Sequence, residues 1–543
     1  LGHAYNSLGA FDQATEYLKQ SLQIAMEIGD IQGEGESLES LGLALHNSDK
    51  LAEAEQNLRQ AIARYEEIRK GLGNSDDFKV SVFEKQTLAY SLLQQVLVAQ
   101  NKPLEALEVA ERGRNRALVE MLFRHGNEEL AERIIPPSPN IEEIRRIARQ
   151  QNATIVEYSV IPNLKYAGIT SQEKNLSPQI YIWVIQPDGN IELRSVQIPE
   201  YTSLKEFITS KLYELINGSN PTIKVENSAK KMYQILINPI AELLHNNEER
   251  QVIFIPHKEL FLFPFVALMD THGKYLIEKH TILTAPSIQS LGLTSKQKKS
   301  FTLPRGGEAL VVGNPILPSG YDYPQGVEEE TYYISQLLEN KPISGAAATE
   351  PIIVDKMANA KLIHFASHGL FKYVDNNSLR PANELIDTEY KQELGAYYID
   401  EKIIEQFGKW QDAIILTSTG DKPSQDGILT SKEIIEQFGL PGSTPLQAEM
   451  VVLSFCQSGR GRITGEGIIG LARSFIAVGV PSLVISMWSV DDSSTAYFME
   501  QFYFNFYVKR LDKAQALRKV QLAMIRSHRL PSEWAAFTLI GQP

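Results

Sequence analysis

The first 125 residues follow a helical repeat. Two stretches in this region, LGHAYNSLGAFDQATEYLKQSLQIA and LGLALHNSDKLAEAEQNLRQAIARY, superimpose with a shift of 40 residues. The shift pairs Gly2 with Gly42, Tyr5 with Leu45, Ala14 with Ala54, Leu18 with Leu58 and Ser21 with Ala61. Small residues stand where two helices must approach closely, and larger apolar residues fill the space between helix pairs. The pattern therefore predicts stacked helix pairs.

A third, weaker unit, LLQQVLVAQNKPLEALEVAERGRNRAL, has Ala106 in the place of Ala54. The repeats resemble the tetratricopeptide pattern, although their spacing is longer than the usual period of about 34 residues. We assign the extra length to GDIQGEG, residues 29–35, as a linker between helix pairs. The pattern is already under way at Leu1, without a Met or a basic-then-apolar leader, so we expect that repeats have been lost upstream and that there is no signal peptide.

An all-α solenoid of this kind either offers a concave surface to a partner protein or merely supports the domain that follows. Because such arrays mostly bind other proteins, the first interpretation is favoured. The first 70 residues carry 12 acidic and 6 basic side chains, so a basic partner segment fits this surface.

Prolines in GNEELAERIIPPSPN end the helical pattern and place a domain boundary near residue 126. Within residues 126–306, IEEIRRIARQQ and SAKKMYQILINPIAELL have the period of amphipathic helices. ATIVEYSVI and QVIFI have the composition of strands, and Asp188-Gly189 joins two further strands as a hairpin. The region predicts an α/β layer without evident chemistry of its own.

Residues 307–543 continue the alternation of strands and helices. Strands are predicted at GEALVVGNP, AKLIHFASHGLF, DAIILTSTG, AEMVVLSFC and PSLVISMWSV, and helices at GVEEETYYISQLLEN, GEGIIGLARSFIAVGV and STAYFMEQFYFNFYVKR. Several of these strands are apolar along their whole length, which is typical of a parallel sheet covered on both faces. We therefore predict a mainly parallel sheet sandwiched by helices.

Composition narrows the class of protein. The formal net charge of −13 disfavours direct binding of nucleic acid or of an anionic membrane, both of which need clustered Lys and Arg. A single cysteine excludes an internal disulfide and a cysteine-based zinc site, so a reducing, cytoplasmic setting is expected. No apolar run reaches the roughly 20 residues that a bilayer span requires. No cofactor or metal is predicted.

Two residues carry candidate chemistry, because active groups collect at the carboxyl ends of strands in parallel sheets. His368 and Cys456 each end a predicted strand. If these strands are neighbours, the imidazole can assist formation of the thiolate and later protonate the leaving amine. The N–H groups of Gly369 and Cys456 could bind a developing oxyanion. Either residue alone is more often structural, so the prediction depends on the pair.

Two other histidines are interpreted as structural. His257 follows a proline at a strand end, but no Ser, Cys or acid is evidently paired with it. His364 lies four residues before His368 and shares its strand face, so we expect a buried, hydrogen-bonded side chain rather than a metal ligand.

The stretches LIHFASHGLF and VVLSFCQSGRGRITGEGIIGLARSFIAVGVPSLVISMWSVDDSS resemble the CHAT domain, a caspase-like domain that accompanies tetratricopeptide repeats. The resemblance extends back through YLIEKHTILTAPSIQSL, LVVGNP, GVEEE and QDGILTSKEI, and AERGRNRALVEML resembles the joining helix. It implies a cysteine protease of the caspase and separase group. It further implies a His–Cys dyad at His368 and Cys456, with Gly369 and Cys456 as the oxyanion hole, and a degenerate protease-like layer at residues 126–306 ahead of the active half, residues 307–543.

The sequence departs from that group at the expected substrate pocket. Ser454 stands where relatives that cut after Arg or Lys often have an acid, and a long insertion, in which IIEQFG occurs a first time, separates His368 from Cys456. Asp491 is the best candidate for the wall of a pocket for a basic residue, although it could equally cap a helix; for Asp492 the cap is favoured. Trp488 could line the pocket or finish the strand in the core. Two arginines after the cysteine, Arg460 and Arg462, stay unassigned.

The favoured hypothesis is a partner-regulated cysteine endopeptidase that acts on a protein substrate. Its repeats would receive the substrate or a regulatory protein or ribonucleoprotein, and in families that it resembles such partners include components of bacterial defence systems. The alternative is a catalytically silent binding scaffold. A thiol redox sensor is disfavoured because no second cysteine could resolve an oxidised Cys456.

Overall fold

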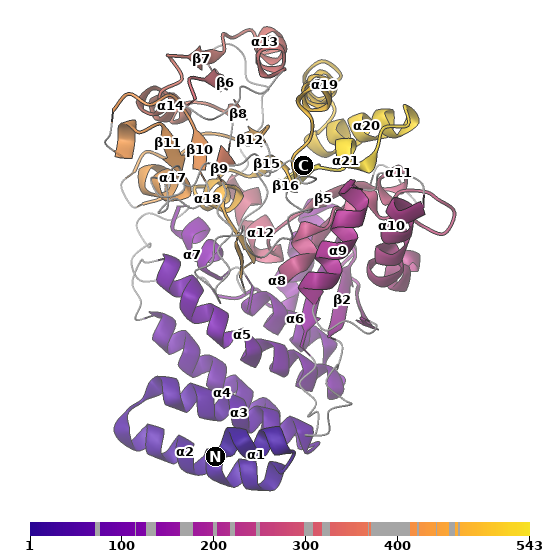
Figure 1. The fold of residues 1–543 in the computed structure, drawn as a ribbon. Coiled ribbons are helices and arrows are strands. Elements are labelled where there is room, and N and C mark those ends of the chain that lie inside the picture. Colours follow the sequence, from indigo (N-terminus) through magenta and orange to yellow (C-terminus); the bar gives the residue numbers. More distant parts are fainter. Residues whose placement is uncertain are drawn as a thin grey trace.

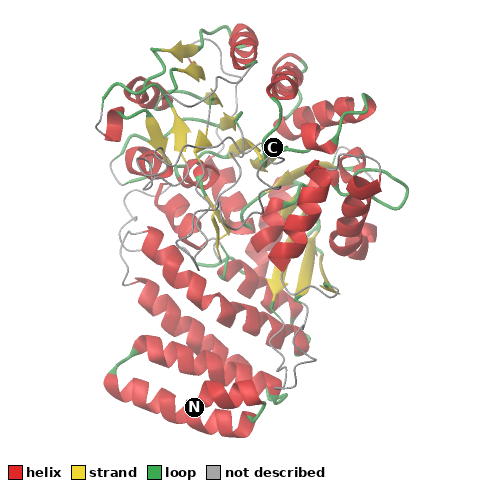
Figure 2. Cartoon of the chain, in the orientation of Figure 1, coloured by secondary structure: helices red, strands yellow, loops and turns green. Residues whose placement is uncertain are grey.

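The computed structural model describes residues 1–70, 76–114, 116–125, 137–162, 178–198, 204–217, 223–245, 250–297, 308–317, 326–367, 369–370, 413–420, 423–440, 443–455, 462–464 and 467–543. The helices near the N-terminus stack at the bottom of Figure 1, and the later residues form an α/β body above them. Figure 2 shows the yellow strands gathered in that body. The predicted order, helical repeats followed by an α/β domain, is confirmed.

The repeat array is built from seven helices: α1 (Gly2–Leu8), α2 (Phe11–Ile28), α3 (Ile31–Asn47), α4 (Leu51–Lys70), α5 (Asp76–Ala99), α6 (Pro103–Arg112) and α7 (Arg116–His125). Ala14, Ala54 and Ala106, which the repeat aligned, are all fully buried. A Cβ added at Gly2 would lie 2.5 Å from Leu18 Cγ, and one added at Gly42 would lie 2.5 Å from Leu58 Cγ. The shift of 40 residues therefore repeats one close helix contact.

The expected linker at residues 29–35 is wrong. Gly29 ends α2 with φ of 71°, Asp30 caps α3 by accepting from Gly33 N–H, and α3 already begins at Ile31. Gly35 lies inside α3. A side chain is disfavoured there, since a Cβ would stand 2.4 Å from the Tyr65 ring. Gly29 thus serves a helix end and Gly35 close helix packing, so the long period comes from long helices rather than from a linker.

The α/β body contains an 11-stranded sheet. Its strands, in order across the sheet, are β3 (Ile191–Gln197), β2 (Gln179–Ile185), β1 (Thr154–Ile161), β4 (Gln251–Ile255), β5 (Thr281–Thr284), β16 (Phe537–Gly541), β15 (Ser482–Ser486), β12 (Met450–Leu453), β8 (Leu362–Ala366), β6 (Ala309–Pro315) and β7 (Ile343–Gly345).

The sheet consists of two parallel blocks that meet at one antiparallel seam. Strands β1, β4, β5 and β16 run parallel to one another, and so do β15, β12, β8, β6 and β7. Between the blocks, β15 and β16 pair antiparallel, while β2 and β3 extend the first block as the predicted antiparallel hairpin. The carboxyl ends of the two blocks therefore lie at opposite edges of the sheet.

Helices cover both faces of the sheet. They are α8 (Ile141–Gln151), α9 (Leu204–Asn217), α10 (Ile223–Leu236), α11 (Leu276–Lys279), α12 (Ile288–Gln297), α13 (Val327–Leu337), α14 (Glu350–Met357), α17 (Ser431–Phe438), α18 (Leu471–Ala477), α19 (Asp492–Tyr503), α20 (Lys513–Arg526) and α21 (Pro531–Trp534). Alternate residues of β12 join different apolar layers: Met450 and Val452 face the layer with α19 and α20, and Val451 and Leu453 the layer with α17 and α18. Of the helices in the described residues, none has the length and apolar character that a membrane crossing requires.

Three predictions for residues 307–543 need correction. β12 ends at Leu453, not at Cys456. The strand predicted at DAIILTSTG, β10 (Ala413–Ile415), lies in a separate three-stranded sheet because it pairs antiparallel with β9 (Gly369–Leu370) and β11 (Ile428–Thr430). Residues 467–469 are not helical, because they form β14 (Gly467–Ile469) and pair with β13 (Arg462–Thr464).

The segment between α6 and α7 joins the repeats to the sheet. Arg114 is 4% exposed and donates to the carbonyl oxygens of Pro256, directly after β4, and of Tyr158, within β1 just beyond its last residue paired with β4. The Glu111 carboxylate accepts from the N–H groups of Ile288 and Gln289, both at 3.0 Å, at the start of α12. The end of α6 and the residues after it are thus anchored to β1, β4 and α12 through buried polar contacts.

Candidate functional site

The strands that lead to His368 and Cys456 are direct neighbours. β8 and β12 run parallel, with His364 opposite Val452 and Phe365 opposite Leu453. The register extends one step further, because Ser454 N–H donates to the Phe365 carbonyl oxygen at 2.8 Å. The predicted dyad requires these two strands to be neighbours, and the structure shows that they are. His368 and Cys456 themselves lie outside the described residues.

The chain leaves the main sheet after β8. Ser367 Oγ donates to the Ile415 carbonyl oxygen at 2.6 Å, and Gly369 pairs with Ile414 in the small sheet. Gly369, the expected oxyanion donor, therefore lies on β9, immediately beyond the carboxyl end of β8. Its role in binding an oxyanion stays a prediction.

Ser454 lies next to the end of β12 and is 3% exposed. By strand alternation its side chain shares the face of Met450 and Val452. Its hydroxyl is buried and has no hydrogen-bond partner among the described residues. A buried hydroxyl without any partner costs roughly 1–3 kcal/mol, so a partner for Ser454 Oγ is expected beyond the described residues.

Asp491 caps helix α19. It accepts from the N–H groups of Ser493 and Ser494 at 3.1 and 3.0 Å and from Ser493 Oγ at 2.6 Å. Partial burial alone would raise the pKa of Asp491, but the hydrogen bonds from Ser493 and Ser494 outweigh it and hold that pKa below its usual value. The prediction that Asp492 caps the helix is wrong. Asp491 is the cap, since its side chain accepts from the N–H groups of Ser493 and Ser494, and Asp492 is the first helical residue.

Trp488 belongs to the core between sheet and helices. It is 2% exposed, and its Nε1–H donates to the Ser532 carbonyl oxygen at 2.8 Å. Its indole ring is buried among the apolar side chains around β15 and α19. Substrate roles for Asp491, Trp488 and Ser454 stay predictions.

His364 is buried and has polar neighbours on both ring nitrogens. Nδ1 lies 3.2 Å from the Tyr503 hydroxyl at the end of α19, and Nε2 lies 3.0 Å from Glu330 Oε1 on α13, although off the hydrogen-bonding direction. Burial, and then the Glu330 carboxylate, raise the pKa of Tyr503 well above its usual value, so the phenol keeps its proton. The sequence predicted a buried histidine, but it singled out neither Glu330 nor Tyr503 as its partner.

His257 is held in a structural role. Its Nδ1 accepts from Val160 N–H at 2.9 Å, and burial, Arg114 and Lys258 together lower its pKa well below the usual value. The neutral imidazole thus accepts from a β1 N–H group beyond the point where β1 and β4 stop pairing.

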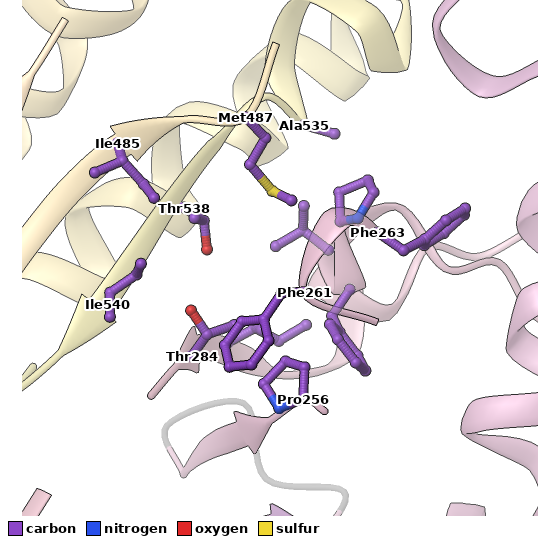
Figure 3. A pocket seen from close by; sticks show the side chains of 13 residues that line it. Pro256, Phe261, Phe263, Thr284, Ile485, Met487, Ala535, Thr538 and Ile540 are labelled. Carbon is purple, nitrogen blue, oxygen red and sulfur yellow. The ribbon is translucent and has the colours of Figure 1, made fainter. Parts of the chain in front are cut away.

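A small apolar cavity lies at the seam of the sheet. Figure 3 shows Ile485, Thr538 and Ile540 facing Phe261 and Pro256 across it. Its volume is about 30 Å³, room for one or two water molecules but not for a peptide side chain. We therefore treat it as a packing gap rather than a substrate site.

The sequence matches the CHAT domain family over residues 226–542 and the tetratricopeptide repeat family over residues 1–67. Tetratricopeptide repeat protein 28 of Mus musculus is 27% identical over 620 residues, which cover 95% of this chain and 25% of the relative. The Homo sapiens protein of the same name is 27% identical over 619 residues, with coverage of 94% and 24%. The chain thus spans about a quarter of the length of these relatives.

Among solved structures, the Saccharomyces cerevisiae separase–securin complex matches 100% of this chain and 47% of its own chain, with 12% identity and a TM-score of 0.49. The Arg-specific cysteine proteinase gingipain R matches 63% of this chain and 74% of its own, with 10% identity and a TM-score of 0.33. The family match over residues 226–542 covers more than half of the sequence. The chain therefore belongs to the CHAT domain family and carries tetratricopeptide repeats ahead of that domain.

Proposed function

We propose that this protein is a cysteine endopeptidase in which Cys456 is the nucleophile and His368 its acid–base partner. The observation that supports the proposal is the register of β8 and β12. The two strands are neighbours and end side by side, and His368 and Cys456 follow these ends in the sequence. Phe365 and Leu453 form the last pair between the two strands. His368 lies three positions after Phe365 in the sequence, and Cys456 three positions after Leu453.

The reaction follows from these groups. His368 takes the thiol proton, and the Cys456 sulfur attacks the scissile carbonyl carbon. The carbonyl π electrons move to oxygen, where the N–H groups of Gly369 and Cys456 stabilise the oxyanion. His368 then gives its proton to the amine nitrogen as the C–N bond breaks. Water, deprotonated by His368, hydrolyses the thioester and restores the thiol.

For the substrate pocket we propose Ser454, Trp488 and Asp491. Ser454 has the best support, because its hydroxyl is buried beside the β12 exit without a described partner. Asp491 would contribute negative charge from the rim, although its Oδ1 is already engaged by the α19 cap.

The repeats are proposed to bind a regulatory protein, or a ribonucleoprotein through its protein part, or the substrate. Support comes from the array itself, whose acidic helices fit a basic segment. We further propose a cytoplasmic setting, in which such control would keep the protease silent until a partner binds.

The decisive experiment compares the intact chain with Cys456→Ala and His368→Ala variants. Each is incubated with candidate partner proteins, and cleavage products are identified by mass spectrometry. We expect products from the unaltered chain and a loss on the order of 10³-fold or more in either variant, because the two residues act as a unit.

Equal cleavage by the unaltered chain and Cys456→Ala would refute the dyad. Partner binding by the repeats without cleavage under any condition would favour the catalytically silent scaffold.

A further inference from the structure

In the block of parallel strands β15, β12, β8 and β6, one row of side chains across the sheet contains a single polar residue. By register, Val311 of β6, His364 of β8, Val452 of β12 and Val484 of β15 lie side by side on the face covered by α13 and α19. All four are fully buried. A valine at position 364 would complete the row without desolvating an imidazole, so packing alone does not account for the histidine.

His364 connects three elements. Glu330 of α13 and Tyr503 of α19 approach opposite ring nitrogens at 3.0 and 3.2 Å, and the imidazole and phenol rings meet edge to face at 5.5 Å between centroids. The exposed fractions of the His364 and Glu330 side chains are 0% and 2%, and Tyr503 is also fully buried. Water therefore cannot compete for these contacts.

The acidic groups around the cluster come from the same two helices. Glu329 of α13 and Glu500 of α19 lie near Glu330, and partial burial together with repulsion from Glu329 and Glu330 raises the pKa of Glu500. On the strand side, the neighbours in register are the apolar Val311 and Val452. Tyr503 is thus the neutral hydrogen-bond partner and Glu330 the acidic neighbour of an imidazole that has valines beside it in the sheet.

Polar contacts fix orientation in a way that apolar contacts do not, since hydrogen bonds are directional and hydrophobic packing is not. In β8 this constraint acts four residues before His368, on the strand that leads directly to it. A misplacement of about 1 Å in a reacting group can cost on the order of 100-fold in rate.

We propose that His364 is a positioning residue, which together with Glu330 and Tyr503 fixes the rotation and height of the β8 exit and thereby aims His368 at Cys456. The inference rests on the proposed dyad and adds to it a buried cluster that touches no substrate. The cluster also makes the aim of His368 depend on how α13 and α19 sit against the sheet.

The single cysteine gives a test that needs no substrate, because Cys456 is the only thiol that iodoacetamide can alkylate, and mass spectrometry follows its peptide. The alkylation rate is measured from pH 5 to pH 10 for the unaltered full chain and for His368→Ala. If the dyad forms, the midpoint of the unaltered chain lies below the free-thiol value of about 8.5, and His368→Ala moves it up.

The cluster is then tested with Tyr503→Phe, which removes one hydroxyl, and His364→Val, which matches the neighbouring row. We expect both to move the alkylation midpoint about one pH unit towards the free thiol. His364→Val also leaves Glu330 buried without the imidazole and should lower the melting temperature, so the midpoint is measured well below the temperature at which that variant unfolds. His364→Asn, whose amide oxygen can accept from Tyr503, should restore part of the shift. The matched control is Tyr158→Phe, which loses an equally buried hydroxyl that donates to the Leu236 carbonyl oxygen in the other block and should leave the midpoint unchanged.

The outcomes separate the two ideas. An unchanged midpoint in His368→Ala refutes the dyad. A shift in His368→Ala without one in Tyr503→Phe and His364→Val overturns the positioning role alone, as would a melting temperature that falls in His364→Val with no movement of the midpoint.

Discussion

Single glycines set how closely the helices of the repeat array approach. Gly42 faces Leu58 so tightly that a Cβ would stand 2.5 Å from its Cγ. Alanine is about 1 kcal/mol better than glycine inside a helix, which by itself would favour a replacement. At this position overpacking, which typically costs 1–3 kcal/mol, outweighs that gain.

We therefore expect Gly42→Ala to lower the free energy of unfolding, by up to about 2 kcal/mol. Urea titration followed by far-UV circular dichroism measures the change. A double-mutant cycle with Leu58→Ala supplies the control, because the smaller partner removes the overlap. Purely additive effects in that cycle would show that the Gly42–Leu58 contact is not the cause.

Glu350 gives the protein a pH-dependent stability. It is 3% exposed, and burial, followed by Glu433 and Asp426, raises its pKa to about 8. The folded state thus holds a proton that the unfolded state releases near pH 4.5. Since the folded state binds more protons in this window, stability falls as pH rises from about 4.5 to about 8.

Glu350→Gln removes that proton equilibrium and keeps the shape of the side chain. We expect the fall in urea midpoint between pH 6 and pH 8.5 to become shallower in this variant than in the unaltered chain. Glu436→Gln, on the exposed face of α17, is the matched control and should keep the original slope. An unchanged slope in Glu350→Gln would contradict the raised pKa.

Residue-scale features could be predicted where a local pattern decides them. The aligned alanines and the Gly2–Gly42 pair followed from the repeat, and the burial of His364 followed from its apolar strand. The partners of His364 could not be predicted, because Glu330 and Tyr503 lie far from it in sequence and only the packing of α13 and α19 on β8 brings them together.

At the scale of elements, helix α19 depends on its first residues for its start. Asp491 satisfies two N–H groups that the helix itself leaves unpaired, and these follow the carboxyl end of β15 closely. The side chain that was considered for a substrate pocket therefore also serves the helix against which the cluster of Glu330, His364 and Tyr503 rests.

Replacing Asp491 by Ala should cost about 1 kcal/mol of stability, whereas Asp491→Asn, which keeps the accepting oxygen, should cost much less. Because the pKa of Asp491 is depressed, the carboxylate's contribution is present above its ordinary pKa and is lost as pH falls through the lower, folded-state value. Thermal unfolding of both variants at pH 7 measures the difference. Equal losses in the two variants would argue against a capping role.

Element types were largely predictable and element ends were not. Amphipathic and apolar periods located α8, β1, β4, β8, β12, β15 and α19. The termini depend on contacts elsewhere in the fold: residues 467–469 pair with β13, and β10 pairs with β9 rather than joining the main sheet. The sequence likewise predicts that the sheet is mainly parallel, but not which strands are neighbours in it, because packing sets the order of the strands.

At the scale of the whole molecule, the repeats and the sheet are coupled through Arg114. Its guanidinium spans the carbonyl oxygens of Pro256, directly after β4, and of Tyr158, within β1, and lies 3.3 Å from the buried Glu157 carboxyl group. A guanidinium presents its donors in a planar fork, so lysine cannot reproduce this bridge. The end of the repeats is therefore held to the α/β body by a bridge of fixed geometry.

We expect Arg114→Ala to separate the unfolding of the two parts, and Arg114→Lys to restore little of their coupling. All four tryptophans, Trp183, Trp410, Trp488 and Trp534, lie outside the repeats, so fluorescence reports on the α/β body while far-UV circular dichroism also follows the repeat helices. The two signals should coincide in the unaltered chain and diverge in Arg114→Ala. Coincident transitions in Arg114→Ala would show that other contacts suffice.

The central place of β16 has a consequence for how the protein is made. Of the eleven strands of the sheet, β16 is the last to leave the ribosome, yet it is the piece that joins the two parallel blocks. Until it arrives, β5 and β15 each present an open edge, and the two blocks have no strand in common. Synthesis itself thus delays closure of the sheet until β16 has been translated, after the ten other strands.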